Sequence, residues 1–267
     1  MSLPGPEDSA DCYGVTDMAA PIAFSLVRTP LANVPRRATV SAVEDLTPTY
    51  RRIHLAGDFA GFDSLGADDH LRIFFVPQDF AAEDVASMRE HPSREYTPVS
   101  WTEVSLVLDF VIHAATGGPA MEWAQHAAPG TVAMIGGPRG SLVIEGQPEW
   151  WLLAGDRTAL PAIRRHLARV APGVPVDAIL IAEDPADEQP LESPGELSVR
   201  WVRSLAELLA ALHELPTRAG EGFSFIAAEQ SIVKPGREHL LSRGVDLEHA
   251  VVKGYWKRGE AEYHAPH

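Results

Sequence analysis

The chain has 267 residues, of which 45% are hydrophobic and 22% charged, and its formal net charge at pH 7 is −15. This composition is typical of a soluble globular protein, and the length favours two domains. Nucleic acid and anionic membrane surfaces are not expected partners, because binding them requires clustered Lys and Arg. Cys12 is the single cysteine, which excludes an intramolecular disulfide and a metal cluster held by cysteines.

The first residues of the chain resemble neither a targeting signal nor a membrane anchor. Residues 1–20 mix small, acidic and proline residues, and we expect them to form a disordered tail. They lack the basic start and the apolar block of a signal peptide. No run of about 18 apolar residues occurs in the chain, so no membrane insertion is expected. The expected location is the cytoplasm.

Residues 21–145 predict an antiparallel Greek-key β-barrel. From Arg37 onward, short alternating or β-branched runs follow one another and are broken by Asp, Gly and Pro. The runs are ATVSAVEDL, TYRRIHLAG, HLRIFFVP, YTPVSW, EVSLVLDFVIHA and TVAMIGG. One expected helix, GPAMEWAQHAAPG, interrupts them with Met121, Trp123 and Ala124 facing inward. Short strands in series with a single helix are typical of a small barrel.

Residues 146–267 predict a parallel α/β domain. EWWLLAGD reads as a buried strand and TALPAIRRHLARVA as an amphipathic helix, with Thr158 as its expected cap and Pro161 in its first turn. The later segments then alternate between strand and helix: VDAILIAED, LSVRWVR, SLAELLAALHEL, GFSFIAAE, KPGREHLLSRG and HAVVKGYW. This alternation predicts a parallel sheet with helices on its faces.

The stretch SREYTPVSW, residues 93–101, allows two interpretations. In the first it is a turn between strands, shaped by Pro98, with Tyr96 packed into the barrel. In the second it forms the rim of a pocket, because the guanidinium of Arg94 can grip a phosphate through two hydrogen bonds. Tyr96 then offers a flat face to a ring, and Thr97 offers a hydroxyl that can reach a ring nitrogen.

Five ordered motifs resemble those of the siderophore-interacting proteins, which are FAD-dependent ferric-siderophore reductases of the ferredoxin-reductase-like superfamily. The motifs are the Arg-x-Tyr-Thr that starts at Arg94, DFVIHAATGGPAMEWA, GGPRGS, LLAGDRTALPAIRR and GYWKRGE. The resemblance spans residues 37–259. It implies a flavin-binding barrel, an NAD(P)H-binding-like α/β domain and FAD as cofactor. The implied electron donor is NADH, NADPH or reduced ferredoxin.

The resemblance assigns the first motif to FAD. Arg94 is expected at the pyrophosphate, and Tyr96 and Thr97 at the isoalloxazine ring. The family usually has a second arginine two residues after the threonine, where this chain has Val99. A phosphate or substrate contact is therefore missing or comes from elsewhere, and Arg139 is a candidate.

The second motif ends a strand and starts a helix. Family resemblance places His113 beside the FAD phosphate and ribose, and the free N–H groups of a helix N-terminus suit a pyrophosphate. The alternative is a structural histidine followed by an ordinary helix start. The expected contacts of this motif are Asp109, Val111, His113, Gly117, Gly118, Pro119, Ala120 and Trp123.

The expected dinucleotide site follows the strand EWWLLAGD. No G-x-G-x-x-G sequence occurs, so an ordinary Rossmann fingerprint does not support it. The resemblance assigns the turn instead, with Asp156, Thr158 and Ala159 as contacts, although helix capping alone would also explain Asp156 and Thr158. Arg157 stands where the family commonly has an acid.

Two acids, Glu183 and Asp184, follow the next expected strand. Their carboxylates can accept hydrogen bonds from ribose hydroxyls and would repel a 2′-phosphate, which favours NADH over NADPH. A solvated acidic loop is the alternative.

The last motif carries large aromatic and basic residues. The resemblance places Tyr255 and Trp256 near the flavin, although sealing of the core would also explain them. Basic side chains near this strand end predict a positive rim for an anionic iron chelate, although they could equally serve solubility. The expected substrate contacts are Arg72, Arg139 and Lys257, with Lys253 and Arg258 beside them.

The leading functional interpretation is a flavin-dependent ferric-siderophore reductase, for which no catalytic acid or base and no resident metal are needed. One rival is a general NAD(P)H:flavin or ferredoxin-type oxidoreductase. Another is a siderophore carrier that passes no electrons. The sequence contains no H-E-x-x-H, nucleophile elbow or Walker A loop, so it offers no motif for hydrolysis or for nucleotide triphosphates.

Overall fold

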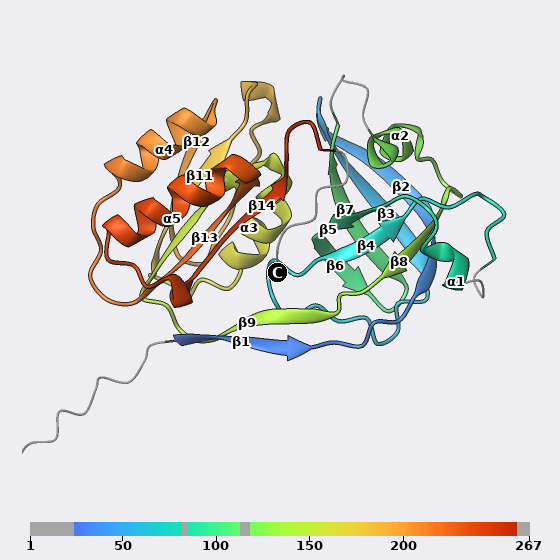
Figure 1. Ribbon diagram of the computed structural model, residues 1–267, viewed down its shortest axis with the longest axis horizontal. Helices are drawn as coiled ribbons and strands as arrows, with labels where there is room; N and C mark the ends of the chain where they lie inside the picture. The colour runs from blue at the N-terminus through green and yellow to red at the C-terminus, as the bar shows by residue number, and fades with distance from the viewer. Residues whose placement is uncertain (1–23, 82–84, 113–117, 261–267) are drawn as a thin grey trace, which may run out of the picture.

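A computed structural model describes residues 24–81, 85–112 and 118–260. The predicted tail over residues 1–20 and the predicted site residues His113 and Gly117 lie outside the described residues. Two sheets lie side by side, one curled and antiparallel and the other parallel, with a two-stranded ribbon running beneath both (Figure 1).

The N-terminal unit is a seven-stranded antiparallel sheet with the order β5-β4-β8-β2-β3-β7-β6. Its inward side chains form one apolar core that includes Ile53, Leu55, Leu106, Leu108 and Phe110. Leu106, Leu108 and Phe110 occupy every second position of β7 and therefore share the face of the strand that packs in this core. The strands are β2 (Arg36–Thr47), β3 (Tyr50–Gly57), β4 (Leu71–Phe74), β5 (Ser93–Tyr96), β6 (Pro98–Thr102), β7 (Ser105–Val111) and β8 (Val132–Gly136).

Two helices accompany this sheet, α1 (Val85–Met88) and α2 (Pro119–His126). The second is the predicted helix, and Met121 and Ala124 are buried beneath it. Trp123 is partly buried and packs against the barrel core.

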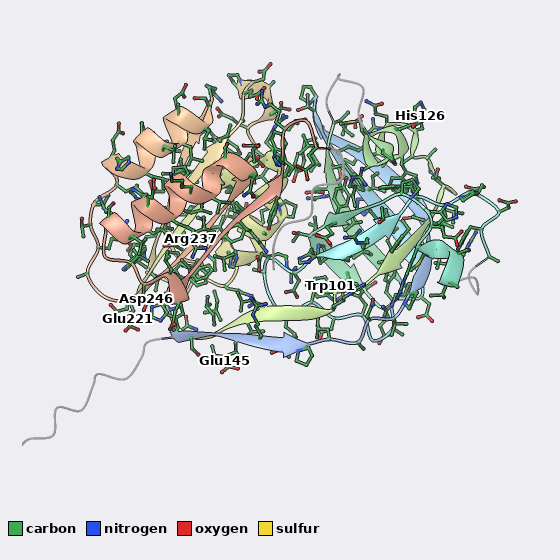
Figure 2. The ribbon with its side chains drawn as sticks, in the orientation of Figure 1. Trp101, His126, Glu145, Glu221, Arg237 and Asp246 are labelled. Carbon is green, nitrogen blue, oxygen red and sulfur yellow. The ribbon has the colours of Figure 1, made fainter. Side chains whose placement is uncertain are left out.

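The strands β1 (Phe24–Pro30) and β9 (Gly140–Gly146) pair with each other along their full length. The sequence analysis did not predict either strand. Phe24 anchors the ribbon, since its ring meets that of Phe223 in the parallel sheet edge to face, with centroids 6.3 Å apart. The exposed acids Glu145 and Asp246 lie on the outer surface near this end of the molecule (Figure 2).

The C-terminal unit is a five-stranded parallel sheet with the order β12-β11-β10-β13-β14. Its strands are β10 (Trp150–Asp156), β11 (Pro175–Ile181), β12 (Glu196–Val202), β13 (Gly222–Glu229) and β14 (Ala250–Trp256). Its helices are α3 (Leu160–Leu167), α4 (Leu205–Glu214) and α5 (Val233–Ser242). Short 3₁₀ turns are η1 (Arg157–Ala159), η2 (Pro185–Asp187), η3 (Gln230–Ile232) and η4 (Leu247–His249).

Side chains of the central strand β10 alternate between two apolar cores. Trp151 and Leu153 pack in the core that contains α3, whereas Leu152 and Ala154 pack in the core that contains α4 and α5. Gly155 is required by the close approach of β13, because a Cβ there would lie 2.2 Å from the carbonyl oxygen of Ala227.

The predicted architecture, an antiparallel barrel followed by a parallel α/β sheet, is confirmed. The predicted division after residue 145 falls at the end of β9, and the assignment of the two parts as separate domains stays a prediction. Within the described ranges, the longest apolar helices are too short to cross a bilayer.

Candidate functional site

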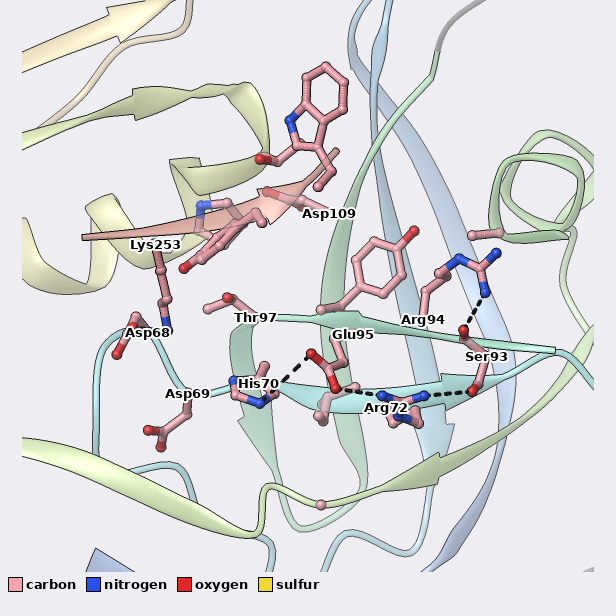
Figure 3. A pocket seen from close by; sticks show the side chains of 18 of the residues that line it. Asp68, Asp69, His70, Arg72, Ser93, Arg94, Glu95, Thr97, Asp109 and Lys253 are labelled. Carbon is pink, nitrogen blue, oxygen red and sulfur yellow. Dashed lines mark hydrogen bonds and ion pairs between the residues drawn. The ribbon is translucent and has the colours of Figure 1, made fainter. Parts of the chain in front are cut away.

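A cavity of about 1930 Å³ lies between the barrel and the parallel sheet. Its walls come from β4, β5 and β7, the start of α2, the turn between β10 and η1, and β14 (Figure 3). Asp156 and Ile181 place the carboxyl ends of two neighbouring parallel strands on this wall. Open α/β sheets bind ligands at this edge, so the cavity is the candidate cofactor and substrate site.

Most of the predicted site residues line the cavity. They are Arg72, Arg94, Tyr96, Thr97, Asp109, Val111, Gly118, Ala120, Arg139, Asp156, Thr158, Tyr255 and Trp256.

Four predicted residues lie elsewhere. Pro119 is the first residue of α2. The ring of Trp123 packs against Phe110, with centroids 5.7 Å apart. Ala159 is fully buried in the core beside α3, and the Lys257 ammonium pairs with Glu260 at 2.6 Å. The structure therefore gives Trp123 and Ala159 packing positions behind the wall.

Positive charge is concentrated in the cavity of this acidic chain. Nine of its 22 Lys and Arg line the cavity: Arg28, Arg72, Arg89, Arg94, Arg139, Arg157, Arg237, Lys253 and Arg258. Among the described Asp and Glu, six do so: Asp68, Asp69, Glu95, Asp109, Asp156 and Glu183. A cleft with this excess of positive charge attracts anions even though the whole protein is negative.

Arg94 and the start of α2 converge on one part of the cavity. A Cβ added at Gly118 would lie 3.5 Å from Arg94 Nη2, so the guanidinium packs against the helix N-terminus. Arg94 Nη1 donates to the carbonyl of Ser93 at 2.6 Å (Figure 3), which fixes the side chain. Gly118 is the N-cap and supplies no side-chain cap. Two positive groups that face one space suit the diphosphate of FAD.

Aromatic side chains form a wall beside this position. The ring of Tyr96 packs on Phe110, with centroids 4.2 Å apart, and Thr97 follows it on the cavity wall. Tyr96 therefore satisfies both sequence interpretations, since it packs into the barrel and lines the cavity.

Two phenol groups on the wall have unused hydrogen-bonding capacity. The hydroxyl groups of Tyr50 and Tyr255 are buried, and neither forms a hydrogen bond of good geometry within the described chain, although Asp109 lies near the first and Thr97 near the second. Burial raises the pKa of both phenols, so both remain protonated donors at neutral pH. Because buried polar atoms without partners are costly, these two hydroxyls fit a cavity that accepts the polar ring of a flavin.

Asp109 lies on the wall, but its carboxylate is engaged. Arg52 Nε and Nη2 donate to its two oxygens at 2.8 and 2.9 Å, and its side chain has no exposed area. Such a bidentate pair fixes the strand β7 to β3. Asp109 is therefore placed to hold the wall in shape.

The basic residues of the predicted positive rim differ in how far nearby carboxylates offset their charge. Arg72 and Glu95 stand opposite each other on β4 and β5 and pair at 2.6 Å, and His70 Nε2 lies 3.9 Å from the other oxygen of Glu95 (Figure 3). This pairing offsets the charge of Arg72. Arg139 is exposed, and the described chain offers it no ion-pair partner. Among the predicted substrate residues, Arg139 is thus the one on the cavity wall whose charge no described carboxylate offsets.

The dinucleotide turn is organised by Asp156. Its carboxylate accepts hydrogen bonds from Thr158 N and from Trp256 Nε1, both at 2.8 Å. Burial raises the pKa of Asp156, and these hydrogen bonds oppose the rise. The prediction that Thr158 caps the following helix is wrong, because Thr158 lies inside η1 and Asp156 is the residue that caps η1. Asp156 also joins the turn to the end of β14.

Sequence reasoning missed several wall residues. Tyr50 starts an ordinary strand, and Arg28 lies on the unpredicted β1, so neither carried a local signal. Arg157 did carry a signal, since it departs from the family pattern. Its Nη1 lies 2.6 Å from Asp187 Oδ2, so this part of its guanidinium is paired within the protein.

Comparison with known proteins first defines the class. Residues 39–142, which include most of the barrel, match the family model of the siderophore-interacting FAD-binding domain. The first unit is therefore a flavin-binding domain, in agreement with the convergence of Arg94 and the start of α2.

The second match identifies the family. Residues 148–259 match the model of the siderophore-interacting protein. The chain is 31% identical over 237 residues to the NADPH-dependent ferric-chelate reductase of Escherichia coli, which covers 83% of this chain and 92% of the relative. The chain belongs to the siderophore-interacting protein family.

Two further proteins are similar over most of their length. The ferric vibriobactin reductase ViuB of Vibrio cholerae is 27% identical, with 80% of this chain and 86% of the relative covered. The crystal structure of a siderophore utilization protein from T. fusca is 28% identical with a TM-score of 0.73, and covers 89% of this chain and 97% of that one.

Proposed function

We propose that this protein is a flavin-dependent ferric-siderophore reductase that passes electrons from NAD(P)H through FAD to a ferric chelate and releases Fe(II). One observation carries the proposal: an acidic chain gathers nine of its 22 basic side chains around one cavity, in a fold that contains a flavin-binding domain. FAD, a dinucleotide and an anionic chelate are all ligands that such a cavity attracts.

The described residues divide the work of holding FAD. Arg94 and the free N–H groups at the start of α2 would bind the diphosphate. Tyr96 and Thr97 would lie at the ring, and the hydroxyls of Tyr50 and Tyr255 would donate to its polar atoms. Bound FAD supplies the redox chemistry, since a flavin accepts two electrons together and releases them singly.

The electron donor is expected at the turn after β10. Glu183 lies on the cavity wall, whereas Asp184 caps η2 by accepting from Ala186 N at 2.9 Å. Of the two predicted ribose acceptors, we therefore assign Glu183 to the dinucleotide. A carboxylate there favours NADH, although the Escherichia coli relative is named as NADPH-dependent. Reduced ferredoxin and a cytoplasmic location stay predictions.

The substrate is proposed to be an anionic ferric chelate. Iron that becomes Fe(II) is held less tightly by the hard oxygen donors of a siderophore. Arg139, together with Arg28 and Arg258, supplies positive charge to the cavity wall. These side chains would hold the chelate beside the flavin site by charge and need no direct ligand to iron.

The proposal is tested first on the purified protein under anaerobic conditions. We expect a yellow, FAD-containing protein whose visible flavin absorption is bleached by NADH or NADPH. Addition of ferric siderophore should restore the yellow colour, and a ferrous trap should report Fe(II).

The same experiment separates the rival functions. A general oxidoreductase would return electrons equally to free flavin and to small ferric chelates. A protein that cannot be loaded with FAD, yet binds ferric siderophore, would be a carrier and would contradict the proposal.

A further inference from the structure

One buried carboxylate connects the two parts of the molecule. Asp187 is the last residue of η2, beyond the carboxyl end of β11, and it is 3% exposed. Its partners on the barrel are Thr47 and Thr49, at the turn between β2 and β3, which precede it by 140 and 138 positions. This contact lies outside the cavity wall, and neither the flavin nor the dinucleotide assignment uses it.

Both oxygens of Asp187 are fully engaged by donors. Oδ1 accepts from Thr47 Oγ1 at 2.6 Å and from Thr49 N at 3.2 Å. Oδ2 accepts from Thr49 Oγ1 at 2.6 Å and from Arg157 Nη1 at 2.6 Å. Arg157 Nη1 also donates to the Thr49 hydroxyl, which closes a ring of three side chains. A buried charge saturated in this way holds its partners in one arrangement.

The residues held by this ring are next to both ligand positions. Arg157 lies between Asp156 and Thr158, which line the dinucleotide turn. On the barrel side, the carbonyl of Thr49 accepts from Ile112 N at 2.8 Å, at the end of the strand that leads to the predicted FAD phosphate loop. Tyr50, on the cavity wall, directly follows Thr49.

We propose that Asp187 is a positioning residue that sets the placement of the dinucleotide turn relative to the flavin-binding barrel. Electron transfer between two bound cofactors requires their reacting parts to be held close together, and small misplacements in an active site cost rate steeply. Asp187 acts on the turn through its ion pair with Arg157, the residue that departs from the family pattern. This inference rests on the proposed function.

Loosening the ring should slow one half-reaction and spare the other. In Asp187→Asn, one oxygen acceptor becomes an amide donor and Arg157 loses its counter-charge. At saturating NADPH, reduction of bound FAD should slow on the order of tenfold or more. FAD affinity and the oxidation of chemically reduced enzyme by ferric siderophore should change far less than this, because neither requires the dinucleotide turn.

The chain offers a matched control on β11, the strand that precedes η2. Asp177, near the start of β11, is 8% exposed and accepts from Arg218 Nη2 at 2.8 Å, within the parallel sheet unit. Asp177→Asn should retain the wild-type reduction rate by NADPH. Thr49→Val, which removes only the hydroxyl from the barrel side of the ring, should slow reduction to a smaller extent and serves if Asp187→Asn does not fold.

A second measurement needs no cofactor. Hydrogen exchange of flavin-free protein should show that the Thr49 amide loses protection in Asp187→Asn and keeps it in Asp177→Asn. Retained protection, or reduction by NADPH at the wild-type rate in both Asp187→Asn and Thr49→Val, overturns the inference. If FAD bound to the wild-type protein accepts no electrons from NADPH or NADH, that result would instead contradict the proposed function.

Discussion

The indole N–H of Trp256 donates to the partly buried carboxylate of Asp156 across 2.8 Å. The two residues are 100 positions apart, and the bond joins the end of β14 to the first strand-to-helix turn of the parallel sheet. Both were predicted as cofactor contacts. Their mutual contact means that the charge on Asp156 depends on Trp256.

Trp256→Phe should change how pH affects dinucleotide binding. Burial raises the pKa of Asp156, and the Trp256 hydrogen bond opposes the rise, so its loss should raise that pKa further. An ionised Asp156 repels dinucleotide phosphates, so binding should tighten as pH falls, and this tightening should begin at a higher pH in the variant. Titration of FAD-loaded protein with NADP⁺ over a pH series measures it. Trp150→Phe, at the other end of β10, is the control; identical curves for Trp256→Phe and wild type would exclude this coupling.

Sequence reasoning predicted the architecture because apolar periodicity and turn residues are local signals. β10 is an example, where five successive apolar residues precede Gly155 and Asp156. The strands β1 and β9 were missed because, within the described residues, each pairs only with the other, away from the two main sheets. Their sequences do not reveal such a partner.

Which residues line the cavity could be predicted from the sequence better than the contacts among them. Motif resemblance gathered Arg94, Tyr96 and Asp156 at one cavity. The pairing of Arg72 with Glu95 depends on the register of β4 with β5, which the sequence does not fix. The contact of Asp187 with Thr47 joins residues 140 positions apart, and no local pattern indicates it.

Arg94→Ala should weaken FAD binding without unfolding the barrel. A charge-assisted hydrogen bond contributes about 1.5–3 kcal/mol, so FAD affinity should fall roughly tenfold to a hundredfold. Fluorescence titration of the flavin-free protein with FAD measures the change. Arg37→Ala, an exposed barrel arginine off the cavity wall, should bind as the wild type does, and equal affinities in both variants would remove Arg94 from the site.

Arg139→Ala should weaken the binding of anionic ferric chelates more than Lys257→Ala does. Arg139 is on the cavity wall, whereas the charge of Lys257 is offset by Glu260 at 2.6 Å. The effect of Arg139 should shrink as salt is raised, because screening weakens exposed charge interactions. Binding is followed by tryptophan quenching with an anionic and a neutral ferric chelate. An equal loss for both chelates would contradict an electrostatic role.

His166→Leu should make stability less sensitive to acid. His166 is buried among Trp151, Phe223 and Phe225, and burial lowers its pKa to about 3. An unfolded histidine takes up its proton near pH 6.5. The contribution of neutral His166 to the free energy of unfolding is therefore fully present above that pH, and it is lost as the pH falls below it.

The size of this effect can be measured by urea unfolding between pH 7 and pH 5. Each unit of pH below the unfolded pKa should cost wild type about 1.4 kcal/mol through His166. The variant should lack this contribution. Its free energy of unfolding should therefore depend on pH less steeply, by the amount that one proton contributes. Parallel curves for wild type and variant would show that His166 is protonated in the folded protein.

The most direct test of the central claim is a stoichiometric titration of reduced protein. FAD-loaded protein is bleached anaerobically with one equivalent of NADH or NADPH, and ferric siderophore is then added in steps with a ferrous trap present. Because the flavin holds two electrons and each iron accepts one, the account predicts full return of flavin absorption with two Fe(II) per FAD. Flavin that stays bleached in excess ferric siderophore, with no Fe(II) trapped, would contradict it.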